Sequence, residues 1–269
     1  MSLRYYCPHW GNQLPFITFC QRVKQAGYDG IEMDLPIDLK ENNIILATLK
    51  EQGLSLIGQY WQSIEKNFPT HLKNYSKYLY HLASANPVLI NAQTGKDYFS
   101  FEQNMQLVAL ARKISDETGV EIVHETHRGK FLFNIPVFKR CAQEDKSIKI
   151  TLDISHWCNV HESFLEDQKE GVQLAINRTR HLHARIGNTQ SAQVNDPRAP
   201  EWKETVGTFL GWWDRVILTH SQKKKNLTIT TEFGPVPYMP TAPYTQKPLA
   251  DQWELNLYML QLLKSRYGV

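Results

Sequence analysis

Four short apolar segments from residue 121 onwards each end in an ionisable side chain. The four end residues are Glu125, Asp153, His183 and Glu232. The intervals are 28 residues (125 to 153), 30 (153 to 183) and 49 (183 to 232), and the excess in the last interval lies after Gly187. Because one strand and one helix of a parallel sheet take about thirty residues, the spacing predicts four successive parallel strands with these groups at their carboxyl ends.

The segment at 121–129 shows why such groups need a partner. It begins as an apolar run typical of a strand buried on both faces, and a period of two places Val123, Glu125 and His127 on one face. A carboxylate and an imidazole inside a sheet are costly to bury when nothing pairs with them. We therefore predict that a metal ion, held jointly with other strands, meets these side chains.

The whole chain alternates eight strand candidates with eight helix candidates. Predicted strands cover residues 3–7, 30–35, 54–61, 87–93, 121–129, 148–153, 180–187 and 227–234, and the predicted helices between them include 44–52, 100–117, 135–143 and 165–177. A barrel of this kind has about 250 residues, so the 269 residues predict an α/β fold with one (β/α)8 TIM-barrel domain over residues 1–269. A doubly wound open sheet is the alternative, but it would bring the last four strands round one centre less readily.

Composition narrows the class of protein further. Apolar residues make up 42% of the chain and the net charge is only +3, which favours a globular protein without a nucleic-acid partner. No apolar run approaches the roughly 18 residues of a membrane span, and the first residues lack the apolar core of a signal peptide. The four cysteines form no C-x-x-C pair. We therefore expect buried thiols, a cytoplasmic location and no membrane partner.

The four strand-end residues together have the chemistry of a metal site. In a TIM barrel the active site lies at the carboxyl ends of the strands. Three carboxylates and one imidazole suit Mn²⁺, Mg²⁺, Co²⁺ or Zn²⁺, and no thiol is placed to favour a softer ion. Each residue alone is better explained as a hydrogen-bonded core residue, but four equivalent positions favour a shared site. We predict that Glu125, Asp153, His183 and Glu232 bind one divalent ion.

Further polar residues near these strand ends are candidates for binding a substrate. His156 follows Asp153 by three residues and is predicted to lie on a loop within reach of a substrate oxygen, with an ordinary surface histidine as the alternative. His127 and Arg185 extend two of the strands. A buried arginine at such a mouth suits a carboxylate or phosphate, or else pairs with an acidic residue across the mouth. His181 lies deeper than His183 and is expected to be a packed interior histidine.

Two tryptophans close early strands of the predicted barrel. Trp10 and Trp61 stand where an indole face can stack on a sugar ring. Aromatic residues at strand ends are more often lids over the core, and this alternative stays open.

The strand-end motifs resemble those of a known superfamily. Residues 124–127, 152–156, 181–183 and 231–233 resemble the metal-site strand ends of the xylose isomerase-like TIM barrels, and residues 27–32 are similar to the second-strand signature of that superfamily. Its members include sugar phosphate isomerases and epimerases, ketose 3-epimerases, hydroxypyruvate isomerases, inosose dehydratases and endonuclease IV. The resemblance implies the same four ligands, His156 as a substrate contact, and Glu125 and Glu232 as a catalytic pair that moves a proton through an enediolate.

The chain departs from the superfamily pattern after its seventh strand. Many relatives carry an acidic residue shortly after the strand-seven histidine, whereas this chain has Arg185. With Arg198 in the following loop, this predicts an anionic substrate group or a lid contact in place of the usual partner. The expected partner is a small carbohydrate. Whether it carries a phosphate, and whether the protein forms a homo-oligomer, stays open.

Three other functions fit the same resemblance. A dehydratase acting on a keto-inositol needs the same metal and carboxylates and differs only in the leaving group. An endonuclease IV-like phosphodiesterase would need further histidines from early strands, where this chain has Glu32, Asp34, Gln59 and Gln93. A barrel that binds a sugar without turnover is disfavoured because all four predicted ligands are present.

Overall fold

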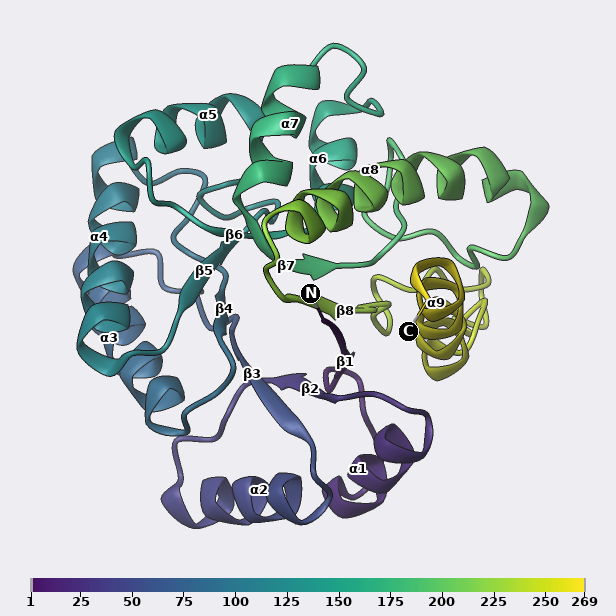
Figure 1. Ribbon diagram of the computed structural model, residues 1–269, viewed down its shortest axis with the longest axis horizontal. Coiled ribbons are helices and arrows are strands. Elements are labelled where there is room, and N and C mark those ends of the chain that lie inside the picture. Colours follow the sequence, from purple (N-terminus) through teal and green to yellow (C-terminus); the bar gives the residue numbers. More distant parts are fainter. Residues whose placement is uncertain (1, 269) are drawn as a thin grey trace.

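Eight parallel strands close into a barrel, and the helices form an outer ring around it (Figure 1). This computed structural model describes residues 2–268. Neighbouring strands pair in chain order, and β8 pairs with β1 to close the sheet. The strands are β1 (Leu3–Pro8), β2 (Gly30–Met33), β3 (Ser55–Tyr60), β4 (Ile90–Ala92), β5 (Ile122–Glu125), β6 (Ile150–Leu152), β7 (Thr179–His183) and β8 (Leu227–Thr230). The predicted (β/α)8 TIM barrel is thus confirmed.

The helices follow the strands and cover the outside of the barrel. They are α1 (Phe16–Gln25), α2 (Leu39–Glu51), α3 (Phe68–Ser84), α4 (Phe101–Thr118), α5 (Ile135–Glu144), α6 (Ile154–His161), α7 (Lys169–Arg178), the short 3-10 turn η1 (Pro200–Trp202), α8 (Lys203–Gln222) and α9 (Gln252–Tyr267). Helix α4 starts with the expected capping box of Ser100 and Gln103, and it ends at Gly119 in the left-handed conformation that glycine favours. Within residues 2–268, no helix is both long enough and apolar enough to span a bilayer.

Helices α2 and α6 differ from the sequence-based expectation because side chains cap their amino ends. Helix α2 begins at Leu39 rather than near residue 44, since the Asp38 side chain accepts a hydrogen bond from the Glu41 amide. Helix α6 is absent from the predicted set. It starts directly after β6 because the Asp153 carboxylate accepts a hydrogen bond from the Ser155 amide. The prediction that His156 lies on a loop is therefore wrong.

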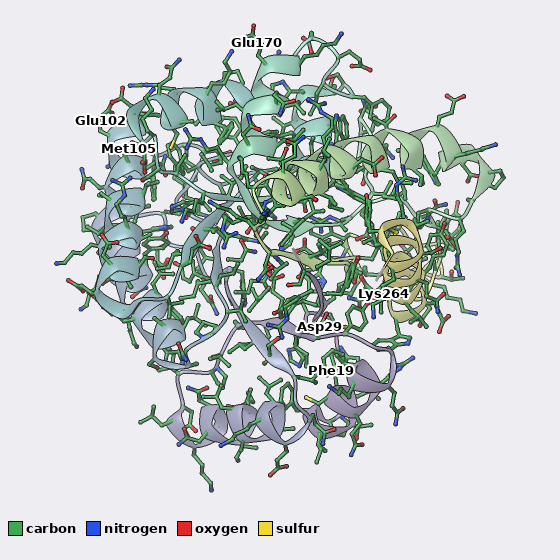
Figure 2. All side chains as sticks on the ribbon, in the orientation of Figure 1. Phe19, Asp29, Glu102, Met105, Glu170 and Lys264 are labelled. Carbon is green, nitrogen blue, oxygen red and sulfur yellow. The ribbon has the colours of Figure 1, made fainter. Side chains whose placement is uncertain are left out.

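Apolar side chains form two separate clusters. The larger one fills the space between barrel and helices (Figure 2), where Phe19 of α1 is buried while Glu102 and Glu170 reach the outer surface. All four cysteines are buried and free. The smaller cluster lies inside the barrel towards the amino ends of the strands and consists of Tyr6, Ile57, Leu89 and Val123. This apolar layer closes the lower half of the barrel, so polar interior positions are concentrated at the carboxyl ends of the strands.

Candidate metal centre

Three of the four predicted ligands converge inside the barrel. Glu125 ends β5, His183 ends β7, and Glu232 lies two residues after β8. One carboxylate oxygen from each glutamate and one ring nitrogen of His183 lie within 4.8 Å of one another. His183 Nδ1 is 3.8 Å from Glu125 Oε1 and contacts Glu232 Oε2 directly. All three side chains are buried, so these groups face one another in an interior with little water.

The converging atoms lack other partners. Within residues 2–268, Glu125 Oε1, His183 Nδ1 and Glu232 Oε2 are buried and have no hydrogen-bond partner outside this group. Buried polar atoms without partners are uncommon in folded proteins, and each costs about 1–3 kcal/mol. Two carboxylate oxygens and one imidazole nitrogen form a donor set that a divalent cation would satisfy at once. The residues present therefore fit a metal ion.

Asp153, the fourth predicted ligand, lies outside this group of three. Its Oδ2 atom pairs with the Arg185 guanidinium, and its Oδ1 atom accepts a hydrogen bond of 3.1 Å from the Ser155 amide. Both Asp153 and Arg185 are fully buried. The sequence allowed Arg185 either to bind an anionic ligand or to pair with an acidic residue across the mouth. In the structure Asp153 is that acidic residue.

Glu32 on β2 contacts His183, one of the three converging ligands, through the ring nitrogen that faces away from Glu125 and Glu232. The sequence did not indicate Glu32 as a site residue. Its carboxylate lies 3.0 Å from His181 Nε2 and 3.1 Å from His183 Nε2, and it accepts a hydrogen bond of 2.9 Å from Asn91 Nδ2. Because Nε2 of His183 faces this carboxylate, a neutral His183 would carry its proton on Nε2, which leaves Nδ1 to face Glu125 and Glu232. A carboxylate that fixes the tautomer of a ligating histidine is a common feature of metal sites.

The pKa shifts show how strongly these groups interact. Burial raises the pKa of Glu125 to about 8; His183 opposes this shift, and the carboxylates of Glu232, Asp153 and Glu32 add to it. Burial alone would lower the pKa of His183, but Glu232 and Glu32 raise it well above its ordinary value. Burial alone would raise the pKa of Glu32, yet His183 and His181 hold it well below its ordinary range. At neutral pH the metal-free centre therefore keeps protons on Glu125 and His183.

A cavity of about 430 Å³ opens above these residues at the carboxyl end of the barrel. Four of the predicted substrate contacts line it, namely Trp10, Trp61, His127 and Arg185. The full lining also contains Met33, Asp34, Gln59, Gln93, Glu232 and Tyr238. A cavity of this size, with a few polar groups converging at its floor, is typical of small-molecule sites.

The other two predicted substrate contacts do not line the cavity. His156 is fully buried in α6, where its ring lies 3.9 Å from that of His127 and its Nε2 atom lies 2.8 Å from an Arg185 nitrogen. His156 therefore packs against two residues that line the cavity, His127 and Arg185, without lining the cavity itself. Arg198 lies at the surface and forms an ion pair of 2.7 Å with Asp196, only two residues away. That short-range pair holds its side chain away from the cavity.

Comparison with known proteins identifies the fold, although no family model and no curated protein sequence matches this chain. A D-allulose 3-epimerase from Methylomonas sp. superimposes with a TM-score of 0.69 at 13% identity, covering 98% of each chain. A 3-keto-D-glucoside 4-epimerase from E. coli gives 0.64 at 14% identity, covering 98% of this chain and 100% of that one. A xylose isomerase-like TIM barrel protein from Mycobacterium smegmatis, solved with magnesium, gives 0.64 at 12% identity and covers 97% of each chain. This chain has the xylose isomerase-like TIM-barrel fold.

The xylose isomerase-like fold is shared by proteins with different names. A probable 3-DHS dehydratase from Bacillus anthracis and an endonuclease IV from Thermus thermophilus also superimpose, with TM-scores of 0.60 and 0.59 at 16% and 11% identity. The fold alone therefore leaves the reaction open, and the side chains of the site have to decide it.

Tyr238 forms one wall of the cavity in this xylose isomerase-like barrel, and sequence reasoning missed it. Its hydroxyl lies 3.2 Å from His127 Nε2, and its ring meets Trp10 edge to face at 5.0 Å. The guanidinium groups of Arg128 and Arg185 lie 5.0 and 4.7 Å from the ring centroid. Tyr238 sits in the Pro-rich loop after β8, where no periodic pattern marks a residue for function.

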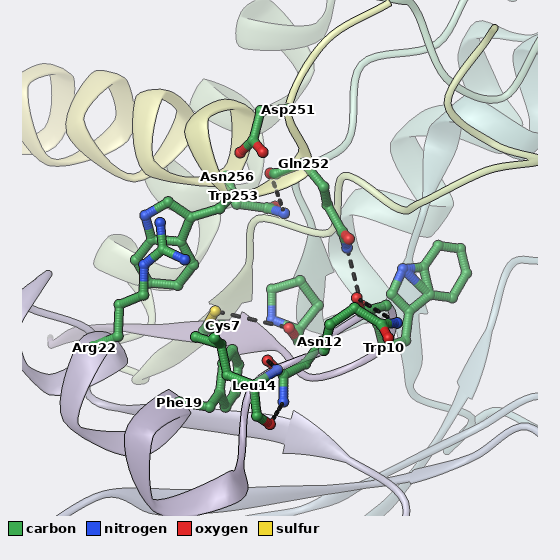
Figure 3. A pocket seen from close by; sticks show the side chains of 13 residues that line it. Cys7, Trp10, Asn12, Leu14, Phe19, Arg22, Asp251, Gln252, Trp253 and Asn256 are labelled. Carbon is green, nitrogen blue, oxygen red and sulfur yellow. Dashed lines mark hydrogen bonds between the residues drawn. The ribbon is translucent and has the colours of Figure 1, made fainter. Parts of the chain in front are cut away.

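Trp10 separates the cavity from a second hollow of about 250 Å³ near the start of α9 (Figure 3). Gln252 Nε2 donates to the backbone carbonyls of Trp10 and Phe233 at 2.9 and 3.0 Å, which ties the β1–α1 loop to the segment after β8. Gly234 lies directly under the indole, because a Cβ atom there would be only 1.7 Å from a ring carbon of Trp10. The position of this wall therefore requires glycine at residue 234.

Replacing Gly234 with alanine should displace the Trp10 indole from the cavity wall. The contact involves a rigid ring that also packs against Tyr238, so we expect a loss of about 1–3 kcal/mol in the free energy of unfolding. Denaturant unfolding and tryptophan fluorescence measure the two effects. Gly211→Ala in α8 is the matched control, since its Cβ would meet no atom within 4 Å. Equal stability and unchanged fluorescence of Gly234→Ala would contradict the prediction.

Proposed function

We propose that this protein is a divalent-metal-dependent enzyme that isomerises or epimerises a sugar by moving a proton between carboxylates. The observation that carries the proposal is the convergence of three buried ligand atoms from Glu125, His183 and Glu232, which have no hydrogen-bond partner outside this group, next to a cavity of about 430 Å³ that Glu232 lines. Two of the solved structures with this fold are named as sugar epimerases, and a third contains magnesium.

In this proposal Glu125, His183 and Glu232 hold the ion, which is Mn²⁺, Mg²⁺, Co²⁺ or Zn²⁺ as the donor set favours. Asp153, the fourth predicted ligand, would keep its ion pair with Arg185 and so hold that guanidinium in the cavity lining. Arg185 would use its remaining N–H groups to hold a neutral substrate oxygen. When bound, the ion would act as a Lewis acid that polarises the substrate carbonyl.

Glu125 and Glu232 are the proposed catalytic residues. They come from different strand ends, an oxygen of each lies near His183 Nδ1, and Glu232 borders the cavity itself. Burial raises the pKa of both side chains, so each is able to hold a proton at its carboxylate. One would take the proton next to the carbonyl and the other would return it. Trp10 and Trp61 offer indole faces to the carbon-bound hydrogens of the sugar, and His127 lies beside them in the wall.

Proton exchange tests the proposal directly. Purified protein is incubated in D₂O with a panel of free ketoses, inososes and their phosphates, with Mg²⁺ or Mn²⁺ and after removal of metal. We expect at least one sugar to exchange the hydrogen next to its carbonyl with solvent deuterium, seen by proton NMR, only when the ion is present. Exchange without metal, or no exchange with any sugar by protein that binds the ion, would reject the proposal.

A dehydratase is the second candidate, since the same carboxylates would remove the same proton and a probable dehydratase shares the fold. The NMR experiment separates the two reactions, because loss of water gives a product with new carbon–carbon unsaturation whereas isomerisation only rearranges hydroxyl and carbonyl groups.

The metal-free protein should lose stability between pH 7 and pH 8, and metal should remove this loss. The folded-state pKa of Glu125 is raised from 4.5 to about 8, so its stabilising contribution is complete below the unfolded value and is lost as the pH rises through 8. His183, whose pKa is raised well above its ordinary value, loses its own contribution in the same direction as the pH rises above 6.5. The expected contribution of Glu125 is about 1 kcal/mol per pH unit in the free energy of unfolding. Glu125→Gln should lack this part of the slope and keep the part due to His183, and a slope equal to that of the natural protein would contradict the assignment.

A further inference from the structure

Two side-chain amides line the cavity without any partner in the protein. Gln59 is the penultimate residue of β3, and Gln93 directly follows β4. Asp34, which directly follows β2, lines the same cavity. Gln59 is only 9% exposed. Among residues 2–268, no side chain or backbone group forms a hydrogen bond with the side-chain amide of either glutamine. The side of the cavity built by β2, β3 and β4 therefore presents unused donors and acceptors to whatever binds there.

The chemistry of these amides matches hydroxyl groups. Each amide donates through its nitrogen and accepts through its oxygen, and a sugar hydroxyl likewise does both. Neither side-chain amide is among the buried polar atoms without a partner, so both reach the cavity, where a ligand hydroxyl would replace the water that hydrogen-bonds them. Two neighbouring strands carry the two amides, which allows them to bind adjacent hydroxyls of one ring.

The charges on this side of the cavity are unfavourable for an anion. Asp34 accepts hydrogen bonds of 3.0 Å from Trp61 Nε1 and Gln62 Nε2, and no Lys or Arg among the described residues lines this side. Arg185, the cation that does line the cavity, is paired with Asp153. Phosphate groups are normally bound by arginine forks, lysines or helix N-termini, and here a phosphate would face the Asp34 carboxylate.

We propose that the ligand is an uncharged, unphosphorylated monosaccharide whose hydroxyls remote from the reacting carbonyl bind Gln59 and Gln93. The orientation of that sugar rests on the proposed function, which places the reacting carbons at Glu125 and Glu232. Trp61, 47% exposed and fixed by its bond to Asp34, supplies an apolar face beside the amides. The structure does not support the anionic ligand expected from Arg185 and Arg198. The charge of Arg185 is balanced by Asp153, and Arg198 pairs with Asp196 at the surface, outside the cavity lining.

Binding measured without turnover tests this specificity. Magnesium-loaded protein is titrated by calorimetry with free D-ketohexoses and with the 1-phosphates and 6-phosphates of the same sugars. We expect at least one free sugar to bind ten times more tightly than either of its phosphates. A preference for a phosphate overturns the proposal, and so does the absence of binding by every free sugar.

Variants of the two glutamines identify the residues responsible. Gln59→Leu and Gln93→Leu should each weaken binding of the free sugar about tenfold, as expected for loss of one or two hydrogen bonds to a ligand. Gln106→Leu on the exposed surface of α4 is the matched control and should leave binding unchanged. Equal sugar affinity in all three variants overturns the role of the amides.

Metal titration without sugar keeps this test separate from the proposed function. Gln59→Leu and Gln93→Leu should bind Mg²⁺ as the natural protein does, because neither residue belongs to the ligand group. Loss of metal binding in these variants would show that the glutamines support the centre instead of the sugar, which also overturns the proposal. Failure of the proposed function would appear differently, as absent metal binding or absent proton exchange in the unchanged protein.

Discussion

Glu232→Gln should reduce turnover by about 10²- to 10⁴-fold, the range that a positioned acid or base contributes to proton transfer, while the barrel stays folded. Glutamine has nearly the same volume but cannot take up a proton at Oε2 or carry the charge that a divalent ion requires. We therefore expect the metal content of the purified variant to fall together with its activity. Proton NMR and metal analysis of the same preparation measure both effects.

The backbone at Glu232 is held by contacts that the substitution leaves in place. Glu232 has a positive φ of 54°, a strained conformation that persists only where the surroundings enforce it. The next two residues are fixed, since the Phe233 amide donates to Asn256 Oδ1 at 2.9 Å and the Gly234 amide donates to Gln193 Oε1 at 2.8 Å. Glu166→Gln on the exposed surface is the control. Unchanged turnover and metal content in Glu232→Gln would reject the proton shuttle.

Glu32→Ala should have the largest effect on stability, about 3–5 kcal/mol, because it leaves polar and charged partners unpaired in the barrel interior. His181, His183 and Asn91 all direct hydrogen bonds at this carboxylate. Loss of the group that fixes the His183 tautomer should also weaken metal binding about 10- to 100-fold. Thermal unfolding and calorimetric metal titration measure the two consequences separately.

Glu32→Gln is the matched comparison, since it keeps the shape and one acceptor oxygen but removes the charge. We expect its losses to be smaller than those of Glu32→Ala, and nitrogen NMR of the imidazoles should show an altered protonation pattern of His183 in both variants. Metal affinity equal to that of the natural protein in a folded Glu32→Ala would contradict the positioning role.

The strands and most of the interior residues could be predicted because they depend on local patterns. Apolar runs at intervals near thirty residues define the strands, and a period of two decides which side chains face inwards. Glu125, His183 and Glu232 follow from these two rules alone. The start of α4 was equally visible, since its capping box occupies four adjacent residues.

The remaining features depend on contacts between distant parts of the chain. Glu32 meets its histidines across 149 and 151 residues, and nothing near Glu32 in the sequence indicates them. The pairing of Asp153 with Arg185 across 32 residues is likewise a tertiary contact. This pairing keeps the Asp153 carboxylate apart from the other three predicted ligands. Tyr238 comes from an irregular loop. Helix α6 has only eight residues and begins where a strand ends, too short for its periodicity to be distinguished.

The apolar layer of Tyr6, Ile57, Leu89 and Val123 has a consequence for the order in which ligands arrive. These four side chains are at most 2% exposed and fill the barrel towards the amino ends of the strands, whereas the cavity borders Glu232 at the carboxyl ends. An ion held by Glu125, His183 and Glu232 would enter through this cavity, the space that a sugar later fills. The ion would therefore arrive first and leave last, and a saturating sugar would trap it against removal by a chelator.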